Sequence, residues 1–409
     1  MRNVNENDSR PKMTAVDLFS GCGGISCGLE RAGLQILAGV DIECDYLQTF
    51  RANFPDALSL ERDLSQAEPA GFMHEVGIAR GSLGLLAGGP PCQGFSKNVP
   101  RRSRYLEDPR NQLVATFLRF AEALMPRFIL LENVAEMKAG FEGAYTSLLL
   151  EALGAKHLGY TVTHGVVNAP DFGVPQRRRR TFFLASRDQE KIAFPLPTHH
   201  IGGKANSLNM FSLQGHVTVW DAISDLVPLE HGEGVDPCHY ATEAQNEFQR
   251  WARGKSSHVY NHVARQLQPT QHQRFVSLEP GQGIKDLPDN LRPKSGYSGA
   301  YGRLTKSMIA PTITRWVFHP GSGRFGHPVS PRVITIREAA RLQAFPDTFH
   351  FAGTYIQQSH QVGNAVPPLL AEIIGLSIVG NTSYSDASHS ASVSRLTSSC
   401  GVGAANWTL

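Results

Sequence analysis

The first half of the chain alternates short apolar runs with segments of helical periodicity, and this alternation limits the fold more than any other feature. The strand candidates are 13–20, 34–41, 81–89, 127–134 and 180–187. Between them, residues 111–126 carry apolar side chains at helical spacing and stop at Pro126. The pattern predicts an α/β fold with a doubly wound, mostly parallel sheet. In such sheets ligands bind outside the carboxyl ends of the strands.

The regular pattern fades after about residue 187. Residues 188–331 are rich in Gly, Pro, His and Asn and contain only short, weak elements, which indicates a second, smaller and irregular domain. Helical pattern returns where Thr335 and Glu338 form a capping box, and again at 367–380. We therefore divide the chain into a polar N-terminal extension (1–13), a main domain (14–187 plus 332–380), an irregular domain (188–331) and a serine-rich tail expected to be disordered (381–409).

Composition excludes few classes of protein. The net charge of +3 is mildly basic, and the basic blocks at 101–104 and 177–180 would by themselves fit a solvated surface. The six cysteines form no C-x-x-C pair, so we expect no metal site. The polar N-terminus resembles no signal peptide, and no apolar run reaches the roughly 18 residues of a membrane span. We expect free thiols in a reducing, cytoplasmic compartment.

The stretch FSGCGGISCGL follows the first strand and opens a helix. Its G-x-G-G spacing differs from the G-x-G-x-x-G of dinucleotide enzymes, which argues against an NAD-dependent oxidoreductase, and the lysine of a P-loop is absent. Asp41 ends the next strand, where a carboxylate can accept two ribose hydroxyls, and Asp63 could contact an adenine amino group. These residues fit S-adenosylmethionine, a nucleoside cofactor without pyrophosphate. A tight turn with helix-capping acids would explain the loop equally well.

Two side chains at strand ends are candidates for catalysis. Cys92 stands in GGPPCQGFS, a loop stiffened by two prolines, although a lone cysteine is more often a buried structural residue. Glu132 follows four apolar residues, so burial should raise its pKa and favour the protonated, proton-donating form. Alternatively, an arginine of the 177–180 block pairs with the carboxylate, and both statements can hold.

The ordered set DLFSGCGG, Asp41, RDL, GGPPCQGFS, ENV, FGVPQRRRR, REAARLQAFP and QVGNAVPP resembles the DNA (cytosine-5)-methyltransferases of bacterial or phage type. The motifs cover 14–187 and 332–380 in the order usual for that family. The Asp/Asn-Pro-Pro-aromatic motif of amino-methyltransferases is not found in the sequence.

The resemblance implies a Rossmann-like methyltransferase fold and a role for each matching residue. Cys92 would attack C6 of cytosine, and Glu132 would bind N3 and the exocyclic amine. Arg180 would hold the ring O2, with Arg178 supporting the site. Methyl transfer to C5 converts S-adenosylmethionine to S-adenosylhomocysteine. The implied cofactor-binding residues are Phe19, Gly21, Gly23, Asp41, Asp63, Pro90 and Asn364.

The resemblance also implies duplex DNA as the partner and extrusion of the target base from the stack. Arg101, Arg102 and Arg104 would contact phosphate from the loop that carries Cys92. The irregular domain would be the target-recognition domain, and its candidate DNA contacts are Arg303, Lys306, Arg315 and Arg324.

Two features depart from the pattern of the family. Asp41 stands where glutamate is usual, and extra arginines at 177 and 179 allow the arginine assignment to shift by one. We expect a monomer that acts in restriction–modification or phage defence, or as a solitary methylase, near the bacterial nucleoid. The alternatives are cytosine-5 methylation of tRNA and a non-catalytic DNA-binding module. Retention of Cys92, Glu132 and the arginine pair argues against the non-catalytic module.

Overall fold

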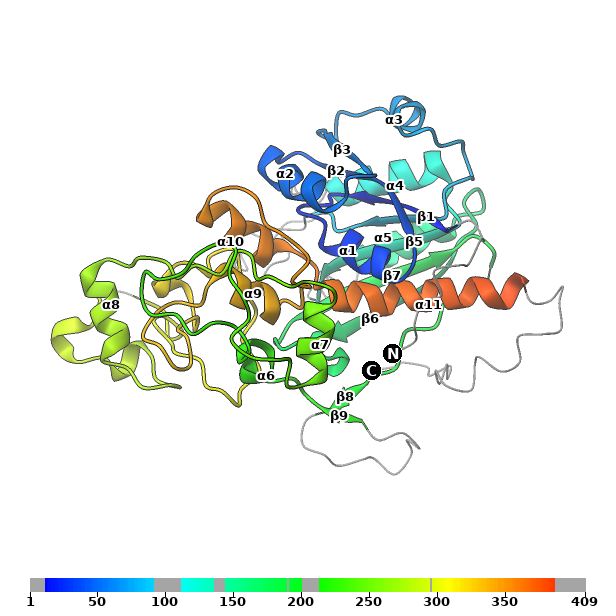
Figure 1. The fold of residues 1–409 in the computed structure, drawn as a ribbon. Helices are drawn as coiled ribbons and strands as arrows, with labels where there is room; N and C mark the ends of the chain where they lie inside the picture. The colour runs from blue at the N-terminus through cyan, green and yellow to red at the C-terminus, as the bar shows by residue number, and fades with distance from the viewer. Residues whose placement is uncertain are drawn as a thin grey trace.

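The computed structural model describes residues 12–91, 112–135, 144–189, 191–200, 213–294 and 296–386 (Figure 1). Its centre is a seven-stranded sheet in the order β3-β2-β1-β4-β5-β7-β6. The strands are β1 (Thr14–Leu18), β2 (Gln35–Asp41), β3 (Leu58–Glu61), β4 (Leu85–Gly88), β5 (Phe128–Val134), β6 (Thr161–Asn168) and β7 (Arg179–Ser186). All neighbouring pairs from β3 to β5 are parallel, which confirms the predicted doubly wound, mostly parallel sheet.

Strand β7 runs antiparallel to both of its neighbours, β5 and β6. In this register Val134 lies opposite Arg180, and Glu132 lies opposite Phe182. An antiparallel strand begins where its parallel neighbours end. The start of β7 therefore lies at the same sheet edge as the carboxyl ends of the other strands.

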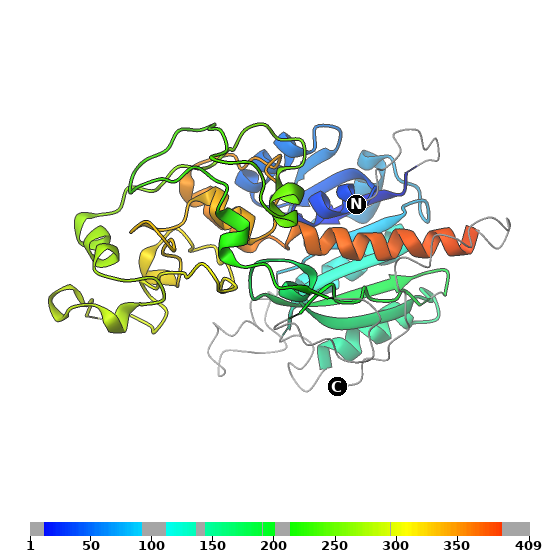
Figure 2. The same ribbon diagram turned by 60° about the horizontal axis from the view of Figure 1, so that its bottom comes forward.

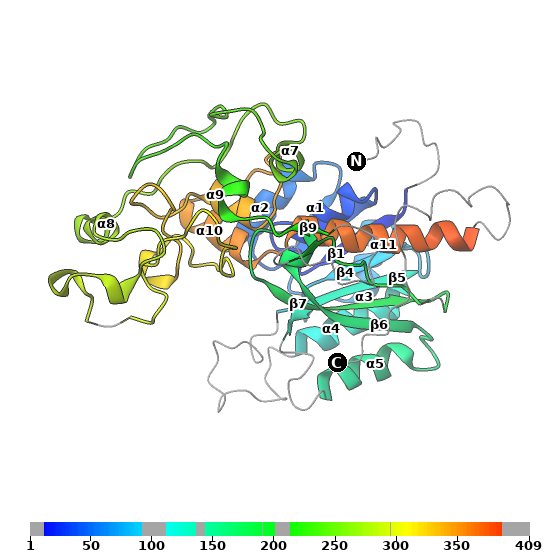
Figure 3. The same ribbon diagram turned by 90° about the horizontal axis from the view of Figure 1, so that it is seen from below.

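Helices cover both faces of the sheet because side chains alternate between the faces along each strand. In β5, Phe128 and Leu130 join one apolar core, whereas Ile129 and Leu131 join the other. The first core includes α1 (Gly24–Arg31), α2 (Cys44–Asn53) and α11 (Pro368–Asp386). The second includes α3 (Pro69–Val76), α4 (Gln112–Leu124) and α5 (Ala144–Gly154), and Figure 3 shows α4 and α5 across the sheet from α11.

Helix α11 lies along α1 in all three views (Figures 1 to 3). The close approach requires Gly28, where a Cβ would lie 2.4 Å from the carbonyl oxygen of Pro368. By length and composition alone, the stretch 355–380 would be apolar enough to cross a membrane, but 61% of its apolar window is buried inside the fold. Its apolar side chains thus serve the packing of the first core.

The region between β7 and the last helix is irregular, as the sequence predicts, and α8 lies far from the sheet (Figures 1 and 2). Its elements are β8 (His199–His200), β9 (Gln214–Gly215), α6 (Val219–Ile223), α7 (Glu247–Arg253), α8 (Pro269–Val276), α9 (Ile336–Leu342) and α10 (Tyr355–Asn364), with short 3₁₀ turns between them. The first apolar core continues into this region through residues of α6 and α9.

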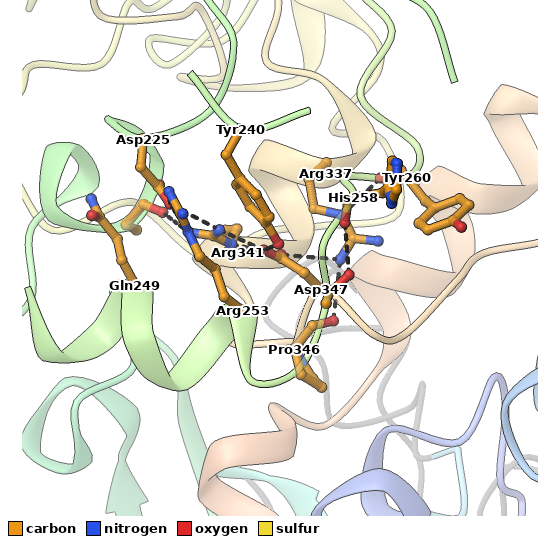
Figure 4. A network of polar contacts seen from close by, with 12 residues as sticks. Asp225, Tyr240, Gln249, Arg253, His258, Tyr260, Arg337, Arg341, Pro346 and Asp347 are labelled. Atoms are coloured by element: carbon orange, nitrogen blue, oxygen red, sulfur yellow. Dashed lines mark hydrogen bonds and ion pairs between the residues drawn. The ribbon is translucent and has the colours of Figure 1, made fainter. Parts of the chain in front are cut away.

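Buried charges join α9 to the rest of the irregular region (Figure 4). The Arg341 guanidinium is fully buried between Asp225 and Asp347, and its Nη1 also donates to the carbonyl oxygen of Ala222 at 2.8 Å. Arg253 reaches Asp225 at 2.7 Å, and Tyr240 donates to Asp347 at 2.7 Å. Buried charges are tolerated when they are paired, and removal of one partner leaves an uncompensated charge. This network therefore holds α9 against the segment that contains Asp225, Tyr240 and Arg253.

Candidate active site

The glycine loop between β1 and α1 turns sharply at the carboxyl edge of the sheet. Phe19, Gly21 and Gly23 have positive φ angles of 59°, 55° and 98°. The Gly23 N–H closes the turn on the carbonyl oxygen of Ser20 at 2.9 Å. A Cβ at Gly23 would lie 2.5 Å from the ring of Phe54, so both space and backbone conformation require glycine.

Asp41, at the end of β2, holds this loop. Its Oδ2 accepts the Gly21 N–H at 2.8 Å, and its Oδ1 accepts the Glu43 N–H at 3.0 Å. Burial raises the pKa of Asp41, and these two backbone donors partly offset that effect. Each carboxylate oxygen keeps a second lone pair. The side chain of the next residue, Ile42, is 61% exposed and offers an apolar surface beside the carboxylate.

Asp63 is exposed on the loop after β3. Its Oδ1 accepts the backbone N–H of Ser65 at 2.9 Å and the Ser65 hydroxyl at 2.6 Å. This is the local side-chain-to-backbone pattern of a turn-capping acid. Oδ2 makes no hydrogen bond with the part of the chain that the structure describes, so the carboxylate can accept a further donor.

The C-terminal motif returns to the glycine loop through Asn364. This exposed residue ends α10, and its Nδ2 donates to the hydroxyl of Tyr46 at 2.8 Å. The ring of Tyr46 lies 3.9 Å from the position that a Cβ on Gly21 would take. Burial raises the pKa of Tyr46 to about 12, so the phenol remains protonated at neutral pH. Segments from both ends of the chain thus meet at this loop.

The end of β4 lies against the end of β5. A Cβ on Gly89 would stand 3.2 Å from Oε2 of Glu132. The Nδ2 of Asn133 donates to the carbonyl oxygen of Pro90 at 3.1 Å, which fixes the start of the proline loop. Four predicted site residues lie outside the described residues, namely Cys92, Arg101, Arg102 and Arg104.

Glu132 is 8% exposed and pairs with Arg180, whose Nε lies 2.7 Å from its Oε1. The pairing of this carboxylate with an arginine of the 177–180 block is therefore confirmed. Nη1 of Arg180 donates to the carbonyl oxygen of Arg179 at 2.8 Å. Within the described ranges Nη2 has no hydrogen-bond partner, which leaves one edge of the guanidinium available.

Arg178 is buried and joins three segments of the chain. Its Nη1 donates to the carbonyl oxygens of Ile313 at 3.2 Å and Gly363 at 3.4 Å. Burial lowers the pKa of Arg178, and the neighbouring charge of Arg180 lowers it further. The two arginines thus have different contacts. Arg180 pairs with the Glu132 carboxylate, and Arg178 donates to backbone carbonyl oxygens.

The four basic residues proposed to contact DNA differ in exposure. Arg303 is 5% exposed, and its guanidinium donates to the carbonyl oxygens of His327, Leu278 and Val329. The structure therefore corrects this expectation, because the donors of Arg303 are already used inside the protein. Arg324 is half-buried and donates to three carbonyl oxygens.

Lys306 and Arg315 are exposed, and each lies over an indole ring. Nζ of Lys306 is 4.4 Å from the ring centroid of Trp220, and the Arg315 guanidinium carbon is 5.0 Å from that of Trp316. Such cation–π contacts orient a cation while leaving it accessible to an anion. Both residues remain candidates for contact with phosphate.

Sequence reasoning missed three residues of this site, namely Ile42, Tyr46 and Asn133. Asn133 adjoins Glu132 in the ENV motif and could have been chosen for that reason. Ile42 directly follows the acid that ends β2. An apolar residue next to a predicted ligand-binding acid could have been identified as an apolar contact for the ligand. Tyr46 carries no local signal, because its contact with Asn364 spans 318 residues.

The fold and the site together define a class. A seven-stranded, mostly parallel sheet, with a glycine loop after β1 and an acid at the end of β2, is the architecture of S-adenosylmethionine-dependent methyltransferases. The chain belongs to the C-5 cytosine-specific DNA methylase family, whose model matches residues 13–380. It is therefore a member of the DNA (cytosine-5)-methyltransferase enzymes.

Bacterial methyltransferases are similar to this chain over most of their length. The type II methyltransferase M1.HphI of Haemophilus parahaemolyticus is 35% identical over 370 residues, which cover 90% of this chain and 87% of that protein. M.AgeI of Thalassovita gelatinovora is 30% identical and is covered over 99% of its length. A solved structure of an E. coli prophage protein, described as a DNA modification methyltransferase, has a TM-score of 0.70 at 27% identity and covers 90% of this chain and 99% of that one.

Proposed function

We propose that this protein transfers a methyl group from S-adenosylmethionine to C5 of a flipped-out cytosine in a specific duplex DNA sequence, through a bond between Cys92 Sγ and C6. The observation that carries the proposal is the Glu132–Arg180 pair, because Gly89 lies against Glu132 and Cys92 follows three residues later. The acid and the cation thus lie at the edge of the sheet from which the chain continues to Cys92, the proposed nucleophile.

Each side chain would act on a different part of the ring. The Cys92 thiolate would add to C6, which makes C5 nucleophilic. Glu132 would hydrogen-bond N3 and the exocyclic amine, with its proton moving to N3 as the thiolate adds. Arg180 would donate to the ring O2 from its available edge. After methylation, solvent water would take the C5 proton, N3 would return its proton to Glu132, and Cys92 would leave as the thiolate, which restores the aromatic ring.

The residues around the glycine loop fit the cofactor. Gly21 and Gly23 allow the backbone to approach a ligand, Asp41 has lone pairs for ribose hydroxyls, and Ile42 offers an apolar face. The remaining contacts with the cofactor would come from Phe19, Asp63, Pro90 and Asn364. When bound, S-adenosylmethionine supplies an electrophilic methyl group on its sulfonium.

The biological setting is inferred from the relatives. M1.HphI and M.AgeI are named type II methyltransferases, and we infer that this chain also marks host DNA in a restriction–modification or phage-defence system, or acts alone. It would work as a monomer in the bacterial cytoplasm, close to the nucleoid. Residues 188–331 would select the sequence that is methylated.

The proposal is tested with duplex DNA that carries 5-fluorocytosine at the target. Bisulfite sequencing of a host that expresses the chain first identifies the methylated sequence. Fluorine at C5 cannot leave as a proton does, so the enzyme should remain bound through sulfur to C6 after methylation. Mass spectrometry should locate the adduct on Cys92, and Cys92→Ala should give neither adduct nor methylation.

Cys238→Ala is the matched control, because this half-buried thiol lies in the irregular region, where its backbone pairs with that of Val259. It should form the adduct and methylate normally. An adduct on the exposed Cys44, or no adduct with an active enzyme, would refute the mechanism. Absence of 5-methylcytosine from the host genome, with the chain folded and expressed, would refute the function.

A further inference from the structure

One segment of the irregular region is held directly beside the active-site arginines. The carbonyl oxygen of Ala310 accepts the Arg177 N–H at 2.8 Å, and the Ile313 N–H donates to Oε1 of Gln176 at 2.9 Å. Arg178 then binds the carbonyl oxygen of Ile313. The segment 310–316 therefore takes its position from the same motif that supplies Arg180.

The other side of this segment rests on α10. A Cβ on Gly363 would lie 2.1 Å from the backbone nitrogen of Arg315, so only glycine permits the contact. The buried hydroxyl of Ser359 donates to the carbonyl oxygen of Arg315 at 2.9 Å. Asn364, the next residue of α10, contacts Tyr46 beside the glycine loop. The segment thus lies between the cofactor side and the catalytic side of the site.

At this position stands Trp316, which is 48% exposed although its surroundings are fixed. The ring of His360 meets it edge-on at 5.4 Å, and the ring of Phe318 lies 5.8 Å away. Among the tryptophans in the described ranges, Trp220 and Trp251 are half-buried, and Trp316 alone is exposed. The indole is therefore held in place while part of its surface remains open.

Arginines lie against this aromatic cluster. Between residues 291 and 337 the sequence contains eight Lys or Arg and no Asp or Glu, and three of the eight pair with acids outside that stretch, namely Arg292, Arg332 and Arg337. The Arg315 guanidinium lies over the Trp316 ring, and that of Arg265 lies 5.0 Å from the ring centroid of Phe318. An exposed aromatic ring beside an exposed arginine is a combination that binds unstacked nucleotides, by stacking on the base and by attraction to the phosphate.

We propose that Trp316 stacks on a base next to the extruded cytosine and that Arg315 contacts an adjoining phosphate. This inference rests on the proposed function, because base faces are hidden in a regular duplex and become accessible where a nucleotide is flipped out. Trp316 would then stabilise the opened duplex. Arg315 would fix the position of the DNA backbone next to the flipped nucleotide.

The test compares Trp316→Ala, Trp316→Phe and Arg315→Ala with the wild type, using duplex DNA that contains the mapped target. In the presence of S-adenosylhomocysteine, Trp316→Ala should raise the Kd for DNA between about 5-fold and about 100-fold, the range of base–aromatic stacking. Trp316→Phe should recover most of the affinity. The Kd for S-adenosylmethionine should stay unchanged. Leu376→Ala, which truncates a 52% exposed side chain on α11, is the control for loss of apolar surface and should bind DNA normally.

Two further measurements separate stacking from a structural role. DNA should quench the tryptophan fluorescence of the wild type, and Trp316→Phe should lose most of that quenching even if Trp316→Ala fails to fold. Arg315→Ala should reduce the slope of log K against log salt by about one, whereas Trp316→Ala should leave the slope unchanged. A wild-type Kd in Trp316→Ala, or full quenching in Trp316→Phe, would overturn the proposal. A parallel loss of cofactor affinity would overturn it too, by placing the ring against the cofactor. Failure of the proposed function would show separately, as absence of 5-methylcytosine with the wild type.

Discussion

Nε of Arg180 lies 2.7 Å from Oε1 of Glu132, across the antiparallel pairing of β5 with β7. The reversal of β7 creates this contact, since a parallel strand would carry its first residues to the opposite edge of the sheet. The contact offsets the charge of the buried Glu132 carboxylate and orients the Arg180 guanidinium beside it. One ion pair thus sets the positions of two groups that we assign to the same cytosine ring.

Substitution of Glu132 should affect the chemical step more than DNA binding. Glu132→Gln keeps the size of the side chain but removes the ionisable group, which pairs with Arg180 as a carboxylate and would donate a proton to N3 as a carboxylic acid. We expect kcat to fall by about 10²-fold to 10⁴-fold, the usual contribution of a positioned acid, with little change in the Kd for DNA. Single-turnover methylation and DNA-binding assays on the same preparation measure the two quantities.

Arg180→Lys is the companion variant. It keeps the positive charge but replaces the planar fork by a single ammonium, so one of the two contacts should be lost. We expect kcat to fall by roughly 10-fold to 100-fold. Arg179→Lys, which changes the exposed neighbour, is the matched control and should retain activity. If Arg179→Lys were the impaired variant, the arginine assignment would shift by one residue.

Loss of the Asp41 carboxylate should weaken cofactor binding. Asp41→Ala removes the acceptor for the Gly21 N–H as well as the proposed ribose contacts. Because a hydrogen bond to a charged group contributes about 1.5 to 3 kcal/mol, the Kd for S-adenosylmethionine should rise by roughly 10-fold to 100-fold. Isothermal titration calorimetry gives the value, and Asp41→Glu should preserve most of the affinity. Unchanged affinity in Asp41→Ala would remove this residue from the cofactor site.

Removal of the Arg341 side chain should destabilise the whole protein. Arg341→Met leaves two buried aspartates short of one partner, although Arg253 and Arg337 still pair with them. We expect the free energy of unfolding to fall by about 3 kcal/mol, as is typical when one partner of a buried ion pair is lost. Urea denaturation followed by circular dichroism measures the change. Arg292→Ala, which breaks an exposed pair with Asp289, should leave stability nearly unchanged.

Asp17 should make stability depend on pH. This fully buried β1 residue accepts the Ser26 hydroxyl at 2.7 Å, and burial raises its pKa from 3.8 to about 7. The folded state therefore holds the proton more tightly than the unfolded state does. The favourable contribution of this group is complete below about pH 4 and is lost as the pH rises to about 7.

The variant Asp17→Asn isolates this effect. As the pH rises from about 4 to about 7, the unfolding free energy of the wild type should fall relative to that of Asp17→Asn. Above about pH 7, the difference between the two proteins should stay constant. The exposed Asp56→Asn serves as the control and should show no such trend. Parallel stability curves for the wild type and Asp17→Asn would show that the carboxyl of Asp17 does not titrate there.

Local pattern in the sequence was enough to predict the elements that build the sheet edge. Apolar runs that end in glycine or an acid located β1, β2, β4 and β5 with the loops that follow them. The four-residue β3 and the half-buried β6 carry too little apolar signal to be recognised as strands. The direction of β7 could not be read from residues 180–187, because an apolar run is the same in both directions.

Side-chain roles that depend on distant backbone were beyond the sequence. Arg303 and Arg315 are equally basic and lie in the same acid-free stretch. Arg303 is enclosed by three carbonyl oxygens from two segments, and Arg315 lies exposed on an indole ring. Only the folded path of the chain distinguishes them. The same holds for Tyr46, whose partner Asn364 comes from the last part of the chain.

The Arg341 network has a practical meaning for exchanging target specificity between relatives. Asp225 and Arg253 belong to 188–331, whereas Arg341 and Asp347 stay with the recipient when that segment is replaced. A replacement segment without an acid at the position of Asp225 would leave the Arg341 guanidinium buried with one of its two acidic partners missing. Compatibility between donor and host should therefore depend on one buried carboxylate as much as on the DNA-contacting surface, and chimeras that satisfy it are the ones expected to fold.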